Sequence, residues 1–307
     1  MLVLITTRCL QAAVVLLGVS LVVFVLVRIV PGDPVRLLVG EQATPEMVAE
    51  ARQAWGLDRP IPVQYLLYLR AWLRADLGWS IRQQRPVGEL VLERIPASLE
   101  LAVVALAIAV GLGVPIGILA ATRMGRVSDL AATAVTLVGQ SLPTFWWGIL
   151  LILVFAVRWR LLPTSGRGSL VQLVLPSVTV ATYITALIAR LTRSCVLEEL
   201  RQDYVRTAMS KGLSGARIVW RHVLRNAAIP VLTIIGIQIG NLLGGAVITE
   251  TIFAWPGLGT LAVQAIYNRD YPLIQAVVLM SAVVFVVTNL AVDLLYTVVD
   301  PRIRVRQ

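Results

Sequence analysis

The chain has 307 residues, of which 58% are hydrophobic and only 14% are charged, and its mean hydropathy is +0.82. Soluble domains carry about 25% charged residues, so this composition excludes a water-soluble enzyme. The net charge is +10, which in a soluble chain would suggest nucleic acid as a partner, but in so apolar a chain it points first to a membrane.

Six apolar segments are long enough to cross a bilayer core of about 30 Å as helices. They cover residues 9–29, 99–122, 130–157, 170–191, 227–249 and 273–299. The first run could be confused with a signal peptide, but its length and the lack of a cleavage site before Arg28 favour a retained helix. The sequence therefore predicts an all-α integral membrane protein with six transmembrane helices.

The positions of the cations predict the orientation. With the N-terminus inside, the cytoplasmic segments hold 14 Lys and Arg residues, and the short outer loops hold four. Eight of the 14 lie between Arg190 and Arg225. We therefore expect both termini in the cytoplasm, and we interpret the positive charge as a topology signal, with no nucleic acid as a partner.

The predicted organisation has three parts. Residues 1–30 form the N-terminal transmembrane helix, residues 31–97 form a helical extracytoplasmic subdomain, and residues 98–307 form a five-helix core. In the subdomain, Thr44-Pro45-Glu46 is a helix start and Gly56 a stop, and Val63 to Ala75 is amphipathic. The sequence favours neither a binding role nor a purely packing role for this subdomain.

The cytoplasmic loop of residues 193–226 is too long for a simple turn. It predicts a short helix over Tyr204 to Lys211, a break at Gly212, and a second amphipathic stretch over Ala216 to Asn226. A soluble partner could bind such a hairpin, whereas a basic loop could equally lie on anionic headgroups. Composition alone leaves both interpretations open.

Catalytic and metal-binding patterns are missing from the sequence. Cys9 and Cys195 are too far apart for a disulfide framework, and His222 is the only histidine. No GxxxxGK[ST] phosphate loop occurs, so the chain is not expected to hydrolyse ATP by itself. We expect no enzyme activity, no metal and no cofactor in this chain.

Nine short motifs follow one another along almost the whole chain. They are VRIVPGDP, GLDRPIPVQY, ADLGWS, PASLEL, QSLPTFWWG, DYVRTAMSKGLS, RHVLRNAAIPVL, ETIFAWPGLG and the closing DPR. Together they resemble the B-type permease subunit of dipeptide, oligopeptide and nickel ABC importers. The spacing from Arg206-Thr207-Ala208 to Gly212 resembles the EAA loop of such permeases, although Arg206 and Thr207 replace its first two letters.

The resemblance implies a type I ABC importer permease in the cytoplasmic membrane of a bacterium. Its partners would be a C-type permease subunit, two ABC ATPases that bind ATP and Mg, and an extracytoplasmic substrate-binding protein or lipoprotein. Short peptides are the leading substrate class, with nickel chelates, glutathione or haem as alternatives. The candidates for contact with the ATPase are Tyr204, Arg206, Thr207, Ala208, Lys211, Gly212 and Leu213.

Polar and turn-forming residues in two spans are candidates for the translocation path and the outer gate. The path candidates are Gln140, Ser141, Pro143, Thr144, Gln238 and Asn241. Hydrogen bonding between helices explains any one of them equally well. The gate candidates are Glu250, Phe253, Pro256 and Gly257, and for Glu250 we prefer a structural role to substrate contact.

Two other function classes stay open at this point. A stand-alone secondary transporter or channel would need acids that face one another in mid-membrane, but Glu100, Glu250 and Asp293 lie toward span ends. A membrane scaffold could use the same cytoplasmic hairpin to recruit a partner that is not an ATPase.

Overall fold

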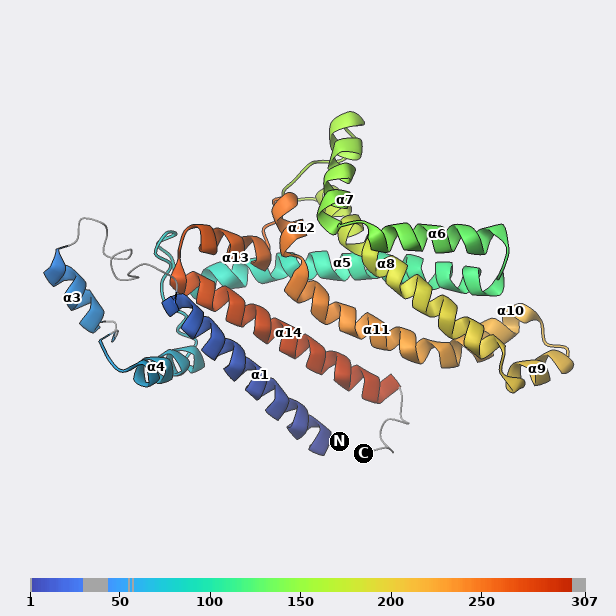
Figure 1. Cartoon of the computed structure of the whole chain (residues 1–307), viewed down its shortest axis with the longest axis horizontal. Helices are drawn as coiled ribbons and strands as arrows, with labels where there is room; N and C mark the ends of the chain where they lie inside the picture. The colour runs from blue at the N-terminus through green and yellow to red at the C-terminus, as the bar shows by residue number, and fades with distance from the viewer. Residues whose placement is uncertain (1, 30–43, 55, 57, 300–307) are drawn as a thin grey trace. The chain divides into compact units, whose positions relative to one another are not determined.

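The structure, a computed structural model, describes residues 2–29, 44–54, 56 and 58–299. The described chain is helical apart from loops and one bridge between Trp79 and Pro86. The helices are α1 (Leu2–Ile29), α3 (Pro45–Ala54), α4 (Ile61–Leu73), α5 (Val87–Thr122), α6 (Val127–Ser141), α7 (Thr144–Leu151), η1 (Ile152–Arg158), α8 (Leu170–Leu200), α9 (Asp203–Ser210), α10 (Gly215–Ile218), η2 (Val219–Val223), α11 (Leu224–Gly245), α12 (Val247–Ile252), α13 (Leu258–Tyr267) and α14 (Tyr271–Val299) (Figure 1). The start of the predicted subdomain and the closing DPR motif lie outside the described residues.

Within the described residues, five helical segments are long and apolar enough to cross a membrane: Thr6–Ile29, Val87–Thr122, Leu170–Leu200, Gly215–Leu242 and Tyr271–Val292. The remaining predicted span, 130–157, is instead a pair of helical segments bent by 105°. The bend follows from Pro143, which has no backbone N–H and which holds Leu142 in the extended region at φ −80° and ψ 128°. The prediction of six spans holds when this bent pair counts as one.

The chain divides into two compact units. The first contains residues 1–96 and 260–286, and the second contains residues 97–259 and 287–307. In the first unit, α4 lies against α1 through Phe24, whose ring centroid is 5.2 Å from that of Tyr65 and 5.7 Å from that of Tyr68. The second helix predicted for the outer segment is therefore packed against the first span.

A buried carboxylate, Asp270, joins two further segments of the first unit. The backbone N–H of Leu273 donates to Asp270 Oδ1 at 3.4 Å, which is the arrangement of a helix N-cap at the start of α14. The hydroxyl of Ser80 and the backbone N–H of Arg82 both donate to Asp270 Oδ2. These bonds connect the ADLGWS motif to the beginning of the last long helix.

In the second unit, α6, α7 and α11 pack against α8. Helix α5 approaches α8 closely at two glycines. A Cβ atom at Gly117 would lie 2.6 Å from Thr192 Cβ, and one at Gly113 would lie 2.9 Å from the backbone oxygen of Thr185. Small residues permit such close approach between membrane helices, so this contact depends on glycine.

We expect Gly117→Ala to lower the free energy of unfolding by about 1–3 kcal/mol, because the added methyl group overlaps α8. Thermal unfolding of the purified protein in detergent measures the change. Gly111→Ala is the matched control, since a Cβ atom there meets nothing within 4 Å. Equal melting of the two variants would contradict the close approach of α5 and α8.

Candidate functional site

The hairpin predicted for the cytoplasmic loop is formed by α9 and α10, residues 203–218, and its turn is defined by Gly212. Gly212 has φ +76°, and its N–H donates to the backbone oxygen of Met209 at 2.9 Å. The N–H of Leu213 donates to the oxygen of Ala208 at 3.3 Å. Together these bonds form a Schellman motif, which ends a helix at a left-handed glycine. A Cβ atom at Gly212 would meet nothing within 4 Å, so backbone conformation, not space, requires the glycine.

The inner face of this hairpin packs on the membrane helices. Val205 is fully buried and Ala208 is 7% exposed, and both join a cluster with Val196 of α8 and Ala121 of α5. Leu213, the residue after the glycine, lies against the same cluster. Ala208 and Leu213, two of the predicted contact residues, therefore hold the hairpin in place.

Tyr204 fixes the hairpin through a polar contact. Its hydroxyl donates to Glu199 Oε2 at 2.5 Å, and the side-chain amide of Asn226 donates to the same oxygen at 3.3 Å. Burial, with the hydrogen bond to Glu199, raises the pKa of the Tyr204 phenol, so the hydroxyl stays a neutral donor. One carboxylate thus connects the end of α8 with α9 and the start of α11.

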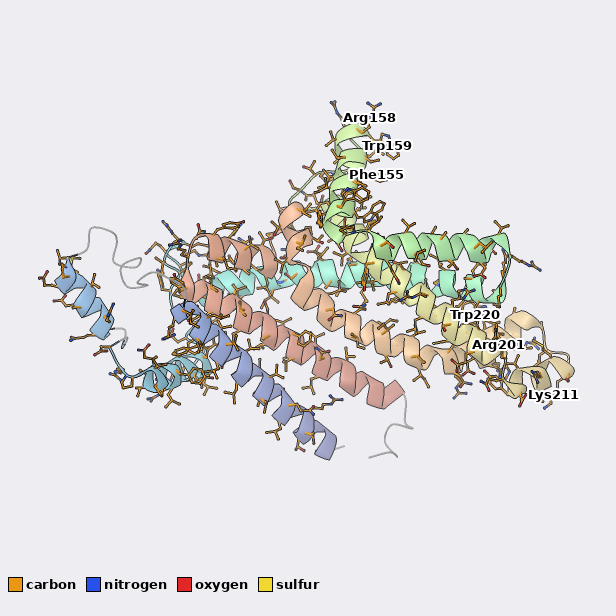
Figure 2. All side chains as sticks on the ribbon, in the orientation of Figure 1. Phe155, Arg158, Trp159, Arg201, Lys211 and Trp220 are labelled. Atoms are coloured by element: carbon orange, nitrogen blue, oxygen red, sulfur yellow. The ribbon has the colours of Figure 1, made fainter. Side chains whose placement is uncertain are left out.

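The outer face of the hairpin is exposed and mostly polar. Arg206, Thr207 and Lys211 are exposed beside Met209, which is 55% exposed, and Arg206 forms an exposed ion pair with Asp203 at 3.4 Å. Figure 2 shows Lys211 at the turn, with Arg201 and Trp220 on the segments that flank the hairpin. Trp220 is 69% exposed. Sequence reasoning did not select Trp220, although a tryptophan on an arginine-rich amphipathic stretch is a detectable signal.

The predicted path residues lie on α6, α7 and α11, or between α6 and α7, and all three helices pack on α8. In α6, Gln140 is half-buried, and the exposed Ser141 donates to the backbone oxygen of Leu137 at 2.8 Å. Pro143 and Thr144 lie at the 105° bend. In α11, Gln238 is buried and accepts a hydrogen bond from the exposed Asn241 at 3.0 Å. Their role in translocation stays a prediction.

The predicted gate residues form a buried group around Glu250, which is 2% exposed. Ser98 Oγ donates to Glu250 Oε1 at 2.7 Å and accepts from the N–H of Leu258 at 2.9 Å. A Cβ atom at Gly257 would overlap the Glu250 carboxylate, and one at Gly259 would lie 2.9 Å from Glu250 Oε2. The loop after α12 therefore encloses this carboxylate with its backbone.

The aromatic residues of the same loop are also internal. Trp255 is buried and its indole N–H donates to the backbone oxygen of Ala97 at 2.8 Å. Phe253, 1% exposed, packs on Leu151 and Leu175, while Pro256 is half-buried. Glu250 and Phe253 therefore support the loop from inside, in line with the structural role preferred for Glu250, and the gate function stays a prediction.

Two polar pairs in the second unit were not predicted from the sequence. Ser98 and Glu250 are 152 residues apart, and Asp129 and Arg193 are 64 residues apart. The PASLEL motif contains Ser98 without indicating a role for it, and no local signal identifies a partner at such separation. Among the described residues, no three His, Cys, Asp or Glu side chains are grouped as a metal site.

We expect Ser98→Ala to lower the free energy of unfolding by about 1–3 kcal/mol, because it removes one hydrogen bond from Glu250 and one from the N–H of Leu258. Thermal unfolding in detergent measures it. The matched control is Ser141→Ala, since this exposed serine bonds only within its own helix. Equal melting temperatures for Ser98→Ala and Ser141→Ala would contradict a contribution of these two hydrogen bonds to stability.

Two family models match the chain. The model for the binding-protein-dependent transport system inner membrane component matches residues 113–305, and the model for the N-terminal part of such membrane components matches residues 1–102. Two solved ABC transporters resemble the fold: the inward-facing MetNI methionine transporter and an amino acid transporter. Their TM-scores are 0.59 and 0.53, at 20% and 19% identity over 70% of this chain and 98% and 94% of theirs.

Curated relatives resemble the chain over nearly its full length. It is 42% identical to the dipeptide transport system permease protein of Escherichia coli (strain K12) and 43% identical to the di/tripeptide transport system permease protein of Pseudomonas aeruginosa (strain UCBPP-PA14). It is also 42% identical to the glutathione transport system permease protein of Salmonella choleraesuis (strain SC-B67). Each alignment covers 94% of both chains.

Proposed function

The chain belongs to the binding-protein-dependent transport system inner membrane component family, and from this premise we propose that it moves short peptides through an ATP-driven importer. It is a multi-pass permease component of an ABC transporter. The observation that best supports coupling between this chain and an ATPase subunit is the α9–α10 hairpin. Its inner face is buried against α8, and its outer face is exposed.

The hairpin is suited to transmit motion from a soluble subunit. Val205 and Ala208 pack against Val196 on α8, so a displacement of α9 acts directly on a long helix of the membrane core. The exposed Arg206, Thr207 and Lys211 supply polar contacts for a cleft on the partner. ATP and Mg would bind the partner ATPase subunits, and this chain would bind no cofactor.

The proposed assembly contains this chain, a related C-type permease subunit, two ATPases and an extracytoplasmic binding protein or lipoprotein. The hairpin faces the cytoplasm of a bacterium, as do both termini, and the Glu250 group lies toward the outside. Alternating access between the two permease subunits would move the substrate inward. Dipeptides and tripeptides are the leading substrates because the relatives at 42% and 43% identity are named for them, with glutathione as the alternative.

An ion-coupled secondary transporter is less consistent with the geometry. Such a protein would need acids that protonate along a water-filled path. Asp129 is instead bound by Arg193, and Glu250 is enclosed by Ser98 and the glycine loop. A scaffold that recruits some other protein would use the same hairpin but would require no transport.

We expect Gly212→Val to reduce peptide uptake into vesicles by about fivefold or more while the protein stays in the membrane. The cause is the left-handed backbone, which costs a β-branched residue about 1–2 kcal/mol and so disrupts the turn. ATP hydrolysis and uptake are measured together on the reconstituted assembly. Gly215→Val is the matched control, because a Cβ atom there meets nothing within 4 Å and the turn does not depend on it. Uptake by Gly212→Val equal to that of the control would contradict the coupling role.

Reversal of charge on the outer face of α9 tests the identity of the partner. We expect the double variant Arg206→Glu and Lys211→Glu to co-purify with about tenfold less ATPase subunit than the wild type when this chain is captured by a tag. Both side chains are exposed, so the reversed charges would meet the partner directly. The control is Arg126→Glu, an exposed arginine outside the hairpin. Recovery of an ATPase-free chain that still transports would overturn the importer assignment.

A further inference from the structure

A cavity of about 210 Å³ lies in the second unit among α5, α6 and α8. Its wall includes Ile116, Thr133, Leu137, Gln140, Arg190 and Arg193. Because a water molecule occupies about 30 Å³ in the liquid, the cavity is large enough for more than a single water. The charges and donors on its wall indicate the chemistry of an occupant.

The two arginines of the cavity differ in their pairing. Arg193 donates to both carboxylate oxygens of Asp129, at 2.7 and 3.0 Å, and the N–H of Gly125 donates to the same carboxylate at 3.0 Å. Asp129 is buried in this arrangement. Arg190, about one helical turn away on α8, is paired with no acid of the described residues. It therefore brings an uncompensated positive charge to the cavity.

Gln140 adds an unused donor from α6. Its Nε2 atom is buried and has no hydrogen-bond partner within the described part of the chain. Thr136, by contrast, already donates its hydroxyl to the backbone oxygen of Thr133 at 2.9 Å. A buried amide N–H without a partner costs free energy, so an occupant with acceptor oxygens would satisfy Gln140 as well as Arg190.

We propose that this cavity binds one anionic glycerophospholipid, with its phosphate oxygens beside Arg190 and an acyl chain along Ile116 and Leu137. Basic pockets between transmembrane helices bind anionic headgroups in general. Arg190 is exposed in the last third of α8 and no acid of the described residues neutralises it, so an anionic headgroup would serve as its counter-ion. The lipid class is inferred from the cavity alone. The proposed orientation of the permease would place this lipid in the cytoplasmic leaflet, and that part rests on the proposed function.

A transported peptide is the competing occupant, because Gln140 is also a candidate for the translocation path. A peptide zwitterion needs an acid for its ammonium group as well as a cation for its carboxylate. No Asp or Glu is among the described residues that line the cavity, and the neighbouring Asp129 is already bound by Arg193. The pattern of charge therefore fits an anionic headgroup better than a zwitterion.

The surface of α6 beside the cavity is apolar. Leu130, Leu137 and Val138 are 66%, 63% and 57% exposed. Leu137 belongs both to this surface and to the cavity wall. An acyl chain could therefore pass from the cavity to the bilayer without crossing a polar surface.

Native mass spectrometry of the full chain, purified with its associated subunits, tests the proposal. The membranes contain phosphatidylglycerol and phosphatidylethanolamine, and retained lipids are counted after loosely bound lipid is removed. We expect Arg190→Gln to lower retained phosphatidylglycerol about tenfold or more, as for the loss of a charge-assisted hydrogen bond. Arg126→Gln removes the same charge outside the cavity and should retain the lipid.

A second variant, Ala132→Phe, reduces the cavity without changing charge and should also displace the lipid. The proposal would be overturned if the wild type and Arg190→Gln retained equal amounts of phosphatidylglycerol. It would also be overturned if the wild type retained as much phosphatidylethanolamine as phosphatidylglycerol. An Arg190→Gln protein that keeps the lipid but loses peptide uptake would identify the cavity as part of the path. The lipid count does not depend on transport. If the proposed substrate or partner is wrong, peptide uptake will fail, but the difference in retained lipid between the wild type and Arg190→Gln will remain.

Discussion

The continuity of α8 is the constraint on which the second unit depends. This helix has 31 residues and a length of about 46 Å, with one proline, Pro176, near its N-terminal end. Its first turns pack against Trp255 and Phe253, and its last turns pack against the α9–α10 hairpin. Helices α5, α6, α7 and α11 also lie against it, so α8 is the element on which the hairpin and these helices all pack.

Three buried carboxylates of the described residues each accept hydrogen bonds from neighbouring groups. Asp129 accepts from Arg193 and a backbone N–H, Glu250 accepts from Ser98, and Asp270 accepts from Ser80 and two backbone N–H groups. A buried charge is tolerable only with such partners. These acids are therefore committed to holding the structure together.

Local signals account for what the sequence predicted well. Apolar runs located the long helices, Thr44-Pro45 located the start of α3, and Gly212 located the turn of the hairpin. The prolines of this span indicated a local bend, but its size of 105° was not predicted, because the apolar run continues through Pro143 and its length suited a single span. The pairing of Ser98 with Glu250 depends on tertiary packing between residues far apart in sequence, so no local pattern could reveal it.

The enclosure of Glu250 by glycines has a consequence for how such chains can vary. Positions 250 and 257 share one small volume, so a side chain at 257 is compatible only with a shorter residue at 250, whereas a Cβ atom at 259 would also lie 2.6 Å from the Cα atom of Val247. A shorter acid at 250 would in turn draw back from the hydroxyl of Ser98. Sequence change at this loop is therefore expected to be concerted: the tolerated substitutions are sets, not single replacements.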